Sequence, residues 1–166
     1  PLEAQLRSHG VDVRTSVTID TVQSGEVLLD DGSTVGPDVI IDASGVVPSV
    51  DLAHAAGLRL GPTGGIAVDA RNRSSDPHIY AAGDIANAMH PVIGQRLRSE
   101  HWQNAISTGE AAAKAILGQD VSFDDIPYFF TDQFDLGMEY SGYAPLTKEA
   151  HLVYRGDHDK REFVVF

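Results

Sequence analysis

The chain has 166 residues, of which 42% are hydrophobic and 22% are charged, a composition that is ordinary for a globular protein and argues against disorder throughout. Its net charge of −12 argues against nucleic-acid binding through bulk electrostatics, and the absence of cysteine excludes disulfides, thiolate metal sites and cysteine redox relays. Because the sequence has no apolar run of membrane-spanning length and no visible signal peptide, we expect a cytoplasmic protein without a membrane partner.

The N-terminal part of the sequence predicts a short helix followed by strands. Residues 2–9 are amphipathic and precede Gly10, a pattern typical of a helix end. Apolar and polar residues then alternate, and Asp31-Gly32 favours a tight hairpin turn. Residues 38–44 form a more continuous apolar run, which predicts a strand buried on both faces. The expected strands cover residues 11–14, 17–22, 26–29, 34–35 and 38–44.

A break in the pattern follows at Gly45-Val-Val-Pro48, because proline cannot continue a strand ladder. A short helix is then expected through Leu52, Ala53, Ala55 and Ala56, with Ser49 or Asp51 as its N-cap and Gly57 after its end.

The next segment, Gly61-Pro-Thr-Gly-Gly65, is rich in turn-forming residues and predicts a linker. It is not a phosphate-binding loop, because no Gly-x-Gly-x-x-Gly or Gly-Lys-Ser/Thr pattern occurs. Residues 66–70 predict a strand, and residues 72–77 a polar loop.

The central segment of the chain is residues 79–82 with the Gly83-Asp84 pair that follows. The four apolar residues predict a short buried strand, and the glycine permits a sharp turn after it. Asp84 would then lie at the carboxyl end of a strand, where ligands bind in α/β sheets. Two interpretations of Asp84 remain open at this point: a turn-capping residue, or an acceptor for ligand hydroxyl groups.

A helix is expected over residues 100–117, with Ser99 as its N-cap and Gly118 after its end. Residues 94–99 before it predict a loop rich in basic residues. Trp102 in the first turn is either a packing residue or part of a ligand site.

The C-terminal part predicts an antiparallel sheet preceded by an aromatic cluster, Tyr128-Phe-Phe130, which we expect to pack in a core. Three strands are expected over residues 133–143, 150–155 and 162–166, with Gly156-Asp157 starting the last turn. The last of these strands leaves a hydrophobic sheet edge, which favours pairing with another chain and hence a homo-oligomer. The seven histidines show no metal-ligand spacing, so no metal site is expected.

Two segments carry a family resemblance. Residues 76–86 (DPHIYAAGDIA) and 98–105 (RSEHWQNA) resemble the second flavin-binding segment of the FAD-dependent pyridine nucleotide-disulfide oxidoreductases, in the ferredoxin and rubredoxin reductase branch. Residues 127–136 and 139–142 resemble the start of that branch's C-terminal domain. Several members of the wider superfamily use a redox disulfide, so the absence of cysteine favours this branch.

The resemblance implies an α/β fold, as a fragment of a glutathione-reductase-like flavoprotein. The end of the NAD(P)-binding domain would cover residues 1–60, the second segment of the FAD-binding domain residues 61–124, and a truncated C-terminal reductase domain residues 125–166. The chain lacks both glycine-rich nucleotide-binding units of a complete reductase.

The resemblance also implies cofactor-binding residues, and no catalytic residue, because FAD and NAD(P)H carry the chemistry. Asp84 would accept hydrogen bonds from the ribityl chain of FAD, and the backbone near the helix start would meet the flavin pyrimidine. The implied cofactor-binding residues are Gly83, Asp84, His101 and Trp102 on the flavin side, and Gly45 and Val46 near the nicotinamide.

The function that follows is electron transfer from NAD(P)H through FAD to a ferredoxin- or rubredoxin-type protein, with the fragment by itself inactive and without bound cofactor. One alternative is a non-catalytic dimerisation or docking module. Another is an NADH oxidase or a protein like apoptosis-inducing factor. Four basic residues could dock an acidic electron carrier, or could pair with neighbouring acids: Arg71, Arg73, Arg96 and Arg98.

Overall fold

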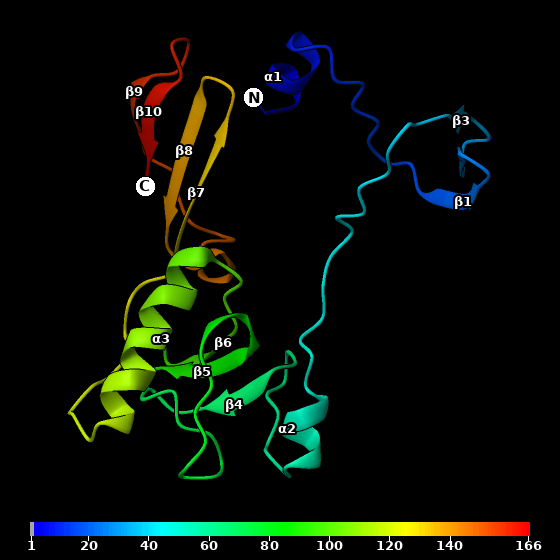
Figure 1. The fold of residues 1–166 in the computed structure, drawn as a ribbon. Helices are drawn as coiled ribbons and strands as arrows, with labels where there is room; N and C mark the ends of the chain where they lie inside the picture. The colour runs from blue at the N-terminus through cyan, green and yellow to red at the C-terminus, as the bar shows by residue number, and fades with distance from the viewer. Residues whose placement is uncertain (1) are drawn as a thin grey trace. The chain divides into compact units, whose positions relative to one another are not determined.

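The computed structural model describes residues 2–166, and Figure 1 shows its helices and strands. The chain divides into two compact units, which are described separately. The first contains the residues up to Val47 together with Thr131–Met138, and the second contains Pro48–Phe130 with Glu139–Phe166. The three-domain division expected from the sequence remains a prediction.

The first unit has a short helix and a small antiparallel sheet, as predicted. Gly10 follows the helix with a φ of 83°, and Gly32 in the hairpin turn has a φ of 82°, both in the left-handed region that glycine adopts without strain. Val27 and Leu29 of the central strand are buried. The elements are α1 (Leu2–Ser8), β1 (Ile19–Gln23), β2 (Glu26–Leu29) and β3 (Thr34–Val35), with β2 in the centre of the sheet.

Two predicted strands of the first unit are wrong. Residues 11–14 and 38–44 are not in strands, and within the second segment Val39 is 76% exposed and Ile41 is 86% exposed. A strand that is apolar on both faces needs hydrogen-bonding neighbours on each side. The described part of the chain provides no such neighbour for residues 38–44, so the apolar pattern alone does not produce a strand.

The second unit contains a three-stranded sheet of β4 (Ile66–Val68), β5 (Ala86–His90) and β6 (Gln95–Leu97). β5 lies in the centre, parallel to β4 and antiparallel to β6. The sequence predicted β4 but not the other two strands, and the predicted loop over residues 94–99 is wrong in part, because it contains β6. Polar residues in both strands hide the apolar pattern that would indicate a sheet.

The predicted strand over residues 79–82 is wrong. Tyr80 makes a single β-bridge with Arg73, and the Ala81 N–H donates to the Asn72 carbonyl oxygen at 3.0 Å. Gly83 then begins a 3₁₀-helical turn, η1 (Gly83–Ile85), which leads directly into β5. Asp84 therefore precedes a sheet strand and does not lie at the carboxyl end of one.

Two α-helices belong to the second unit, α2 (Asp51–Ala55) and α3 (Trp102–Ile116). Gly57 and Gly118 follow them with φ values of 70° and 73°, which confirms both predicted helix ends. The predicted N-caps are wrong: neither helix start has a side-chain cap, and the N-cap residues are Val50 and His101.

The C-terminal strands form two separate hairpins, where the sequence predicted one sheet of three strands. Gly156 and Asp157 lie within a strand, and the turn that they were expected to start covers residues 158–161. A short 3₁₀ turn, η2 (Ala144–Leu146), precedes the second hairpin. The strands are β7 (Tyr128–Gln133) with β8 (Leu136–Ser141), and β9 (Tyr154–Asp157) with β10 (Glu162–Val165).

The core of the second unit is a cluster of small and branched apolar side chains. A closed turn adjoins it: the Gly61 N–H donates to the Gly65 carbonyl oxygen at 2.9 Å, and buried Asn87 donates to the Thr63 hydroxyl at 2.7 Å. The apolar cluster contains Ala53, Leu58, Ile66, Val68, Ala81 and Ala86.

No helix among the described residues has both the length and the apolarity needed to cross a membrane.

Candidate cofactor-binding site

A hydrogen bond between Gly83 and Thr108 joins η1 to α3. Gly83 has a φ of 72°, and its N–H donates to the Thr108 hydroxyl oxygen at 2.8 Å. The same hydroxyl donates to the Asn104 carbonyl oxygen at 2.6 Å, and Thr108 is 1% exposed. The buried hydroxyl therefore serves both as acceptor and as donor. Because it belongs to α3 and accepts from Gly83, η1 lies against the N-terminal half of α3.

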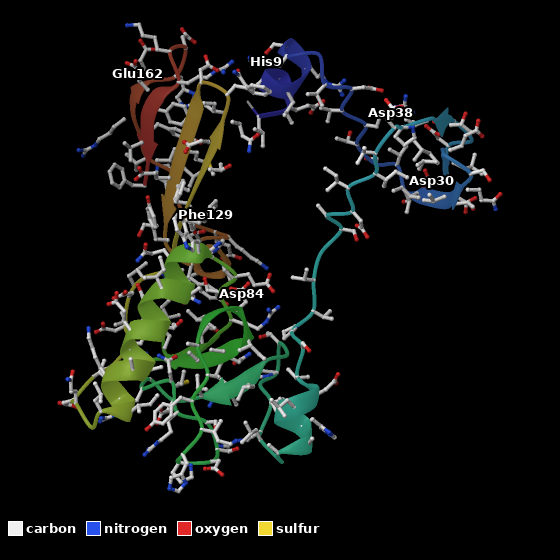
Figure 2. The ribbon with its side chains drawn as sticks, viewed as in Figure 1. His9, Asp30, Asp38, Asp84, Phe129 and Glu162 are labelled. Carbon is white, nitrogen blue, oxygen red and sulfur yellow. The ribbon has the colours of Figure 1, made fainter. Side chains whose placement is uncertain are left out.

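Asp84 follows Gly83 in η1, and its side chain is exposed (Figure 2). Its backbone carbonyl oxygen accepts a 3.4 Å hydrogen bond from Nη1 of Arg98. The side chain therefore remains available while the backbone is held. An exposed carboxylate of this kind can accept hydrogen bonds from the hydroxyl groups of a ligand.

The first turn of α3 has an electrostatic asymmetry. It contains no acidic residue and no side-chain cap, so no side chain of this turn compensates the partial positive charge of its backbone N–H groups. The approach to the helix is fixed by the Asn104 amide, which donates to the Ser99 carbonyl oxygen at 2.8 Å. The Ser99 hydroxyl, which was the predicted cap, is buried without a partner among the described residues.

Aromatic rings gather at the start of α3. The His101 ring stacks on Phe129 with centroids 4.9 Å apart, and the Trp102 ring lies 6.4 Å from that of Phe130. Trp102 is 72% exposed and Phe130 is 48% exposed, so neither is a core residue, and for Phe130 the prediction of a packed core cluster is wrong. Sequence reasoning missed this role of the β7 aromatic residues, although three consecutive aromatic residues were the available signal.

These features fit a flavin. The exposed carboxylate suits the ribityl hydroxyls, the uncapped helix start suits an electron-rich ring edge, and the exposed Trp102 offers a flat apolar surface. The structure places Gly83 and Asp84 on η1, and His101 and Trp102 at the start of α3, so the four residues lie on two adjoining elements. Their assignment as cofactor-binding residues remains a prediction.

Gly45 and Val46, expected near the nicotinamide, belong to the first compact unit. Val46 is 77% exposed, and Gly45 has a φ of 126°. Just before them, the hydroxyl and the N–H of Ser44 donate to the Asp42 carboxylate and lower its pKa from the ordinary 3.8. The nicotinamide role of Gly45 and Val46 remains a prediction.

A separate cavity of about 270 Å³ lies beside the first turns of α3. Gln103 and Ser107 of α3 line one part of it, and Asp125 and Tyr128 line another. Asp84 and Trp102 do not line this cavity, so it is not the hollow in which the expected flavin contacts would meet. Among the described residues, no cluster of three or more histidine, aspartate or glutamate side chains could hold a metal ion.

The four arginines considered as a docking patch are paired within the second unit. Arg71 contacts Asp120, Arg73 contacts Asp69, and Arg98 contacts Glu100. Arg96 donates to the carbonyl oxygens of Val68 and Asn87 at 2.8 and 2.7 Å. This arrangement favours the structural interpretation of these residues over a free basic patch.

Comparison with known proteins identifies the family of this chain. The sequence model of the family described as pyridine nucleotide-disulphide oxidoreductase matches residues 1–109. The chain belongs to this family, and the proteins to which it is similar include ferredoxin reductases. This confirms the fold class and the resemblance inferred from residues 76–86 and 98–105.

Two similar proteins are a curated relative and a solved structure. The ferredoxin–NAD(+) reductase component of the anthranilate 1,2-dioxygenase system of Burkholderia cepacia is 35% identical over 86% of this chain and 34% of its own length. The ferredoxin reductase for the CYP199A2 system of Rhodopseudomonas palustris has a TM-score of 0.88 and 30% identity, over 99% of this chain and 41% of that one.

A third similar structure is a covalent complex of putidaredoxin reductase with putidaredoxin. It has a TM-score of 0.86 and 28% identity, over 99% of this chain and 40% of that one. The chain thus spans between 34% and 41% of the length of these three proteins.

Proposed function

We propose that this chain supplies one side of the flavin site of a reductase that passes electrons from NAD(P)H through FAD to a ferredoxin- or rubredoxin-type protein. The observation that carries the proposal is the Gly83–Thr108 hydrogen bond. It joins η1, which contains the exposed Asp84, to α3, whose start is uncapped. The names of the similar proteins support the reaction class, and the putidaredoxin complex supports an iron–sulfur protein as partner.

When bound, FAD supplies the conversion of a two-electron hydride into single electrons. The Asp84 carboxylate would hold the ribityl chain through hydrogen bonds from its hydroxyls. The backbone N–H groups at Trp102 would face the pyrimidine edge, where the positive end of the helix stabilises negative charge. The exposed Trp102 ring would exclude water from one side of the site.

The 166 residues by themselves would bind FAD only weakly, and would not turn over. One carboxylate hydrogen bond and one helix end contribute about 3–5 kcal/mol together, which corresponds to a Kd of about 1 mM. An isotope-labelled sample titrated with FAD tests this, with the backbone amide chemical shifts as the readout. We expect shifts centred on Asp84 and Trp102 that saturate at millimolar FAD.

The matched variants are Asp84→Asn and Glu110→Gln, because each removes one negative charge from the second unit. Glu110 is exposed in the middle of α3, away from its start. Asp84→Asn should weaken FAD binding about tenfold, and Glu110→Gln should leave it unchanged. Equal effects of the two variants, or shifts far from η1 and α3, would refute the assignment of the site. Tight stoichiometric binding would refute the weak-binding estimate.

A second candidate function is a dimerisation or docking module. The C-terminal hairpin favours it, since Val164 is 55% exposed and Phe166 is 69% exposed on an edge without a further strand among the described residues. Sedimentation velocity separates the two candidates. A concentration-dependent dimer that Val164→Lys converts to monomer would support the module, and a strict monomer at all concentrations would exclude it.

A further inference from the structure

The side chain of Arg98 connects three segments of the second unit. Its Nε donates to the Thr63 carbonyl oxygen at 3.2 Å, and its Nη1 donates to the Asp84 carbonyl oxygen at 3.4 Å. Nη1 also forms an ion pair with the Glu100 carboxylate. The guanidinium thus contacts the turn before β4, the η1 turn, and the residues that lead into α3.

The surroundings of Arg98 are built closely around it. Its side chain is 17% exposed, which is low for an arginine. A Cβ placed on Gly65 would lie 3.1 Å from Arg98 Cδ and would overlap the Ile85 carbonyl oxygen. Gly65 also has a φ of 75°. Only glycine leaves the space through which the arginine stem passes toward η1.

Arg96, two residues earlier, provides an instructive contrast. It donates to the carbonyl oxygens of Val68 and Asn87, which belong to the sheet itself. Arg96 therefore stabilises the sheet, whereas Arg98 contacts η1 and the approach to α3. These are the two elements that carry Asp84 and Trp102.

We propose that Arg98 is a positioning residue of the flavin site, a role that rests on the proposed function. Its contact with the Asp84 carbonyl fixes the backbone from which the carboxylate projects. Its ion pair with Glu100 fixes the chain two residues before Trp102. The planar guanidinium makes these contacts in diverging directions at once, which a lysine ammonium on a flexible stem does not reproduce.

The test compares Arg98→Gln, Arg98→Lys and the control Arg59→Gln in the complete 166-residue chain. Arg59 is exposed, and only its backbone takes part in hydrogen bonds that the structure records. An FAD titration followed by amide chemical shifts should give about tenfold weaker binding for Arg98→Gln. Arg98→Lys should recover only a small part of the loss, and Arg59→Gln should bind as the original chain does.

Amide hydrogen exchange without FAD provides a second readout. It distinguishes a local effect on η1 and the start of α3 from a general loss of stability. The Ala86 N–H bonds to the Gly83 carbonyl in η1, and the Ala105 N–H bonds to the His101 carbonyl at the start of α3. The Leu117 N–H bonds to the Ala113 carbonyl at the far end of the helix. Arg98→Gln should accelerate exchange at Ala86 and Ala105 about tenfold and leave Leu117 unchanged.

The outcomes separate the two proposals. Faster exchange at all three amides would mean that Arg98 stabilises the fold in general, and would overturn the positioning role. Local acceleration with unchanged FAD affinity would overturn its connection to the flavin. Absence of FAD binding by the original chain at millimolar concentration would overturn the proposed flavin site, and with it the positioning role toward flavin. The exchange data would still decide whether Arg98 orders η1 and α3.

Discussion

The N–H of Gly83 donates a 2.8 Å hydrogen bond to the hydroxyl of Thr108, 25 residues later in the chain. The bond is buried, and the same hydroxyl donates back to the Asn104 carbonyl. The hydrogen bond thereby holds the η1 turn against the interior of α3. The candidate site exists because of this connection, since the carboxylate follows Gly83 and the helix start lies before Thr108.

Replacement of Thr108 by valine tests this connection. The two side chains have nearly the same shape, so the main loss is the acceptor for the Gly83 N–H. A buried donor without a partner costs about 1–3 kcal/mol in the free energy of unfolding. Urea denaturation measures it. Thr108→Ser keeps the hydroxyl and should lose less, and a loss in the valine variant no larger than that in the serine variant would contradict the role assigned to this hydrogen bond.

Gly61 tests the closed turn beside β5. A Cβ at this position would overlap the side-chain amide of Asn87, which is buried and donates to Thr63 and Gly64. Gly61→Ala should therefore lower the free energy of unfolding by about 1–3 kcal/mol. The double variant Gly61→Ala with Asn87→Ala should be less destabilised than the sum of the single variants, because the overlap is gone. Strict additivity of the two losses would contradict the overlap.

The pH dependence of the first unit should include a contribution from Asp31. The hydroxyl and N–H of Ser33 donate to its carboxylate and hold its pKa below the ordinary 3.8. A lowered pKa in the folded state stabilises the fold above the unfolded pKa, and that contribution disappears as the pH falls through the folded value. Carboxyl chemical shifts titrated from pH 6 to about pH 2 measure this. Ser33→Ala should raise the pKa of Asp31 toward 3.8, and an unchanged titration would contradict the assigned cause.

Local signals in the sequence predicted the helix ends and the hairpin turn at Gly32 correctly. Glycines 10, 57 and 118 end their helices with positive φ, and Gly32 occupies the hairpin turn. Each of these outcomes depends on the conformational freedom of one residue. The strand predictions were wrong more often, because a strand depends on a neighbouring strand for its hydrogen bonds. Residues 38–44 have the apolar pattern without a neighbour, whereas β5 has neighbours without a clear apolar pattern.

The candidate site was named through family resemblance, and the structure supplies the contacts that connect it. The sequence motif indicated Asp84 and Trp102 and predicted a strand before the aspartate. The motif contains Arg98 but gave it no role in the site, and it does not extend to Thr108. The contacts of both residues arise only when distant segments pack together. Side-chain hydrogen bonds across 14 to 25 residues leave no spacing pattern in a single sequence.

Gly109 is a position where a substitution should raise the free energy of unfolding, in contrast to Thr108 and Gly61. A Cβ at Gly109 would meet nothing within 4 Å, so the small residue is not needed for a close approach to another part of the chain that the structure describes. It lies in the helix interior without a positive φ, so only its backbone entropy remains as a cost. Gly109→Ala should raise the free energy of unfolding by about 0.5–1 kcal/mol in urea denaturation. Gly83→Ala, at a φ of 72°, is the control that should destabilise, and a loss of stability in Gly109→Ala would show that this face of α3 is covered in solution.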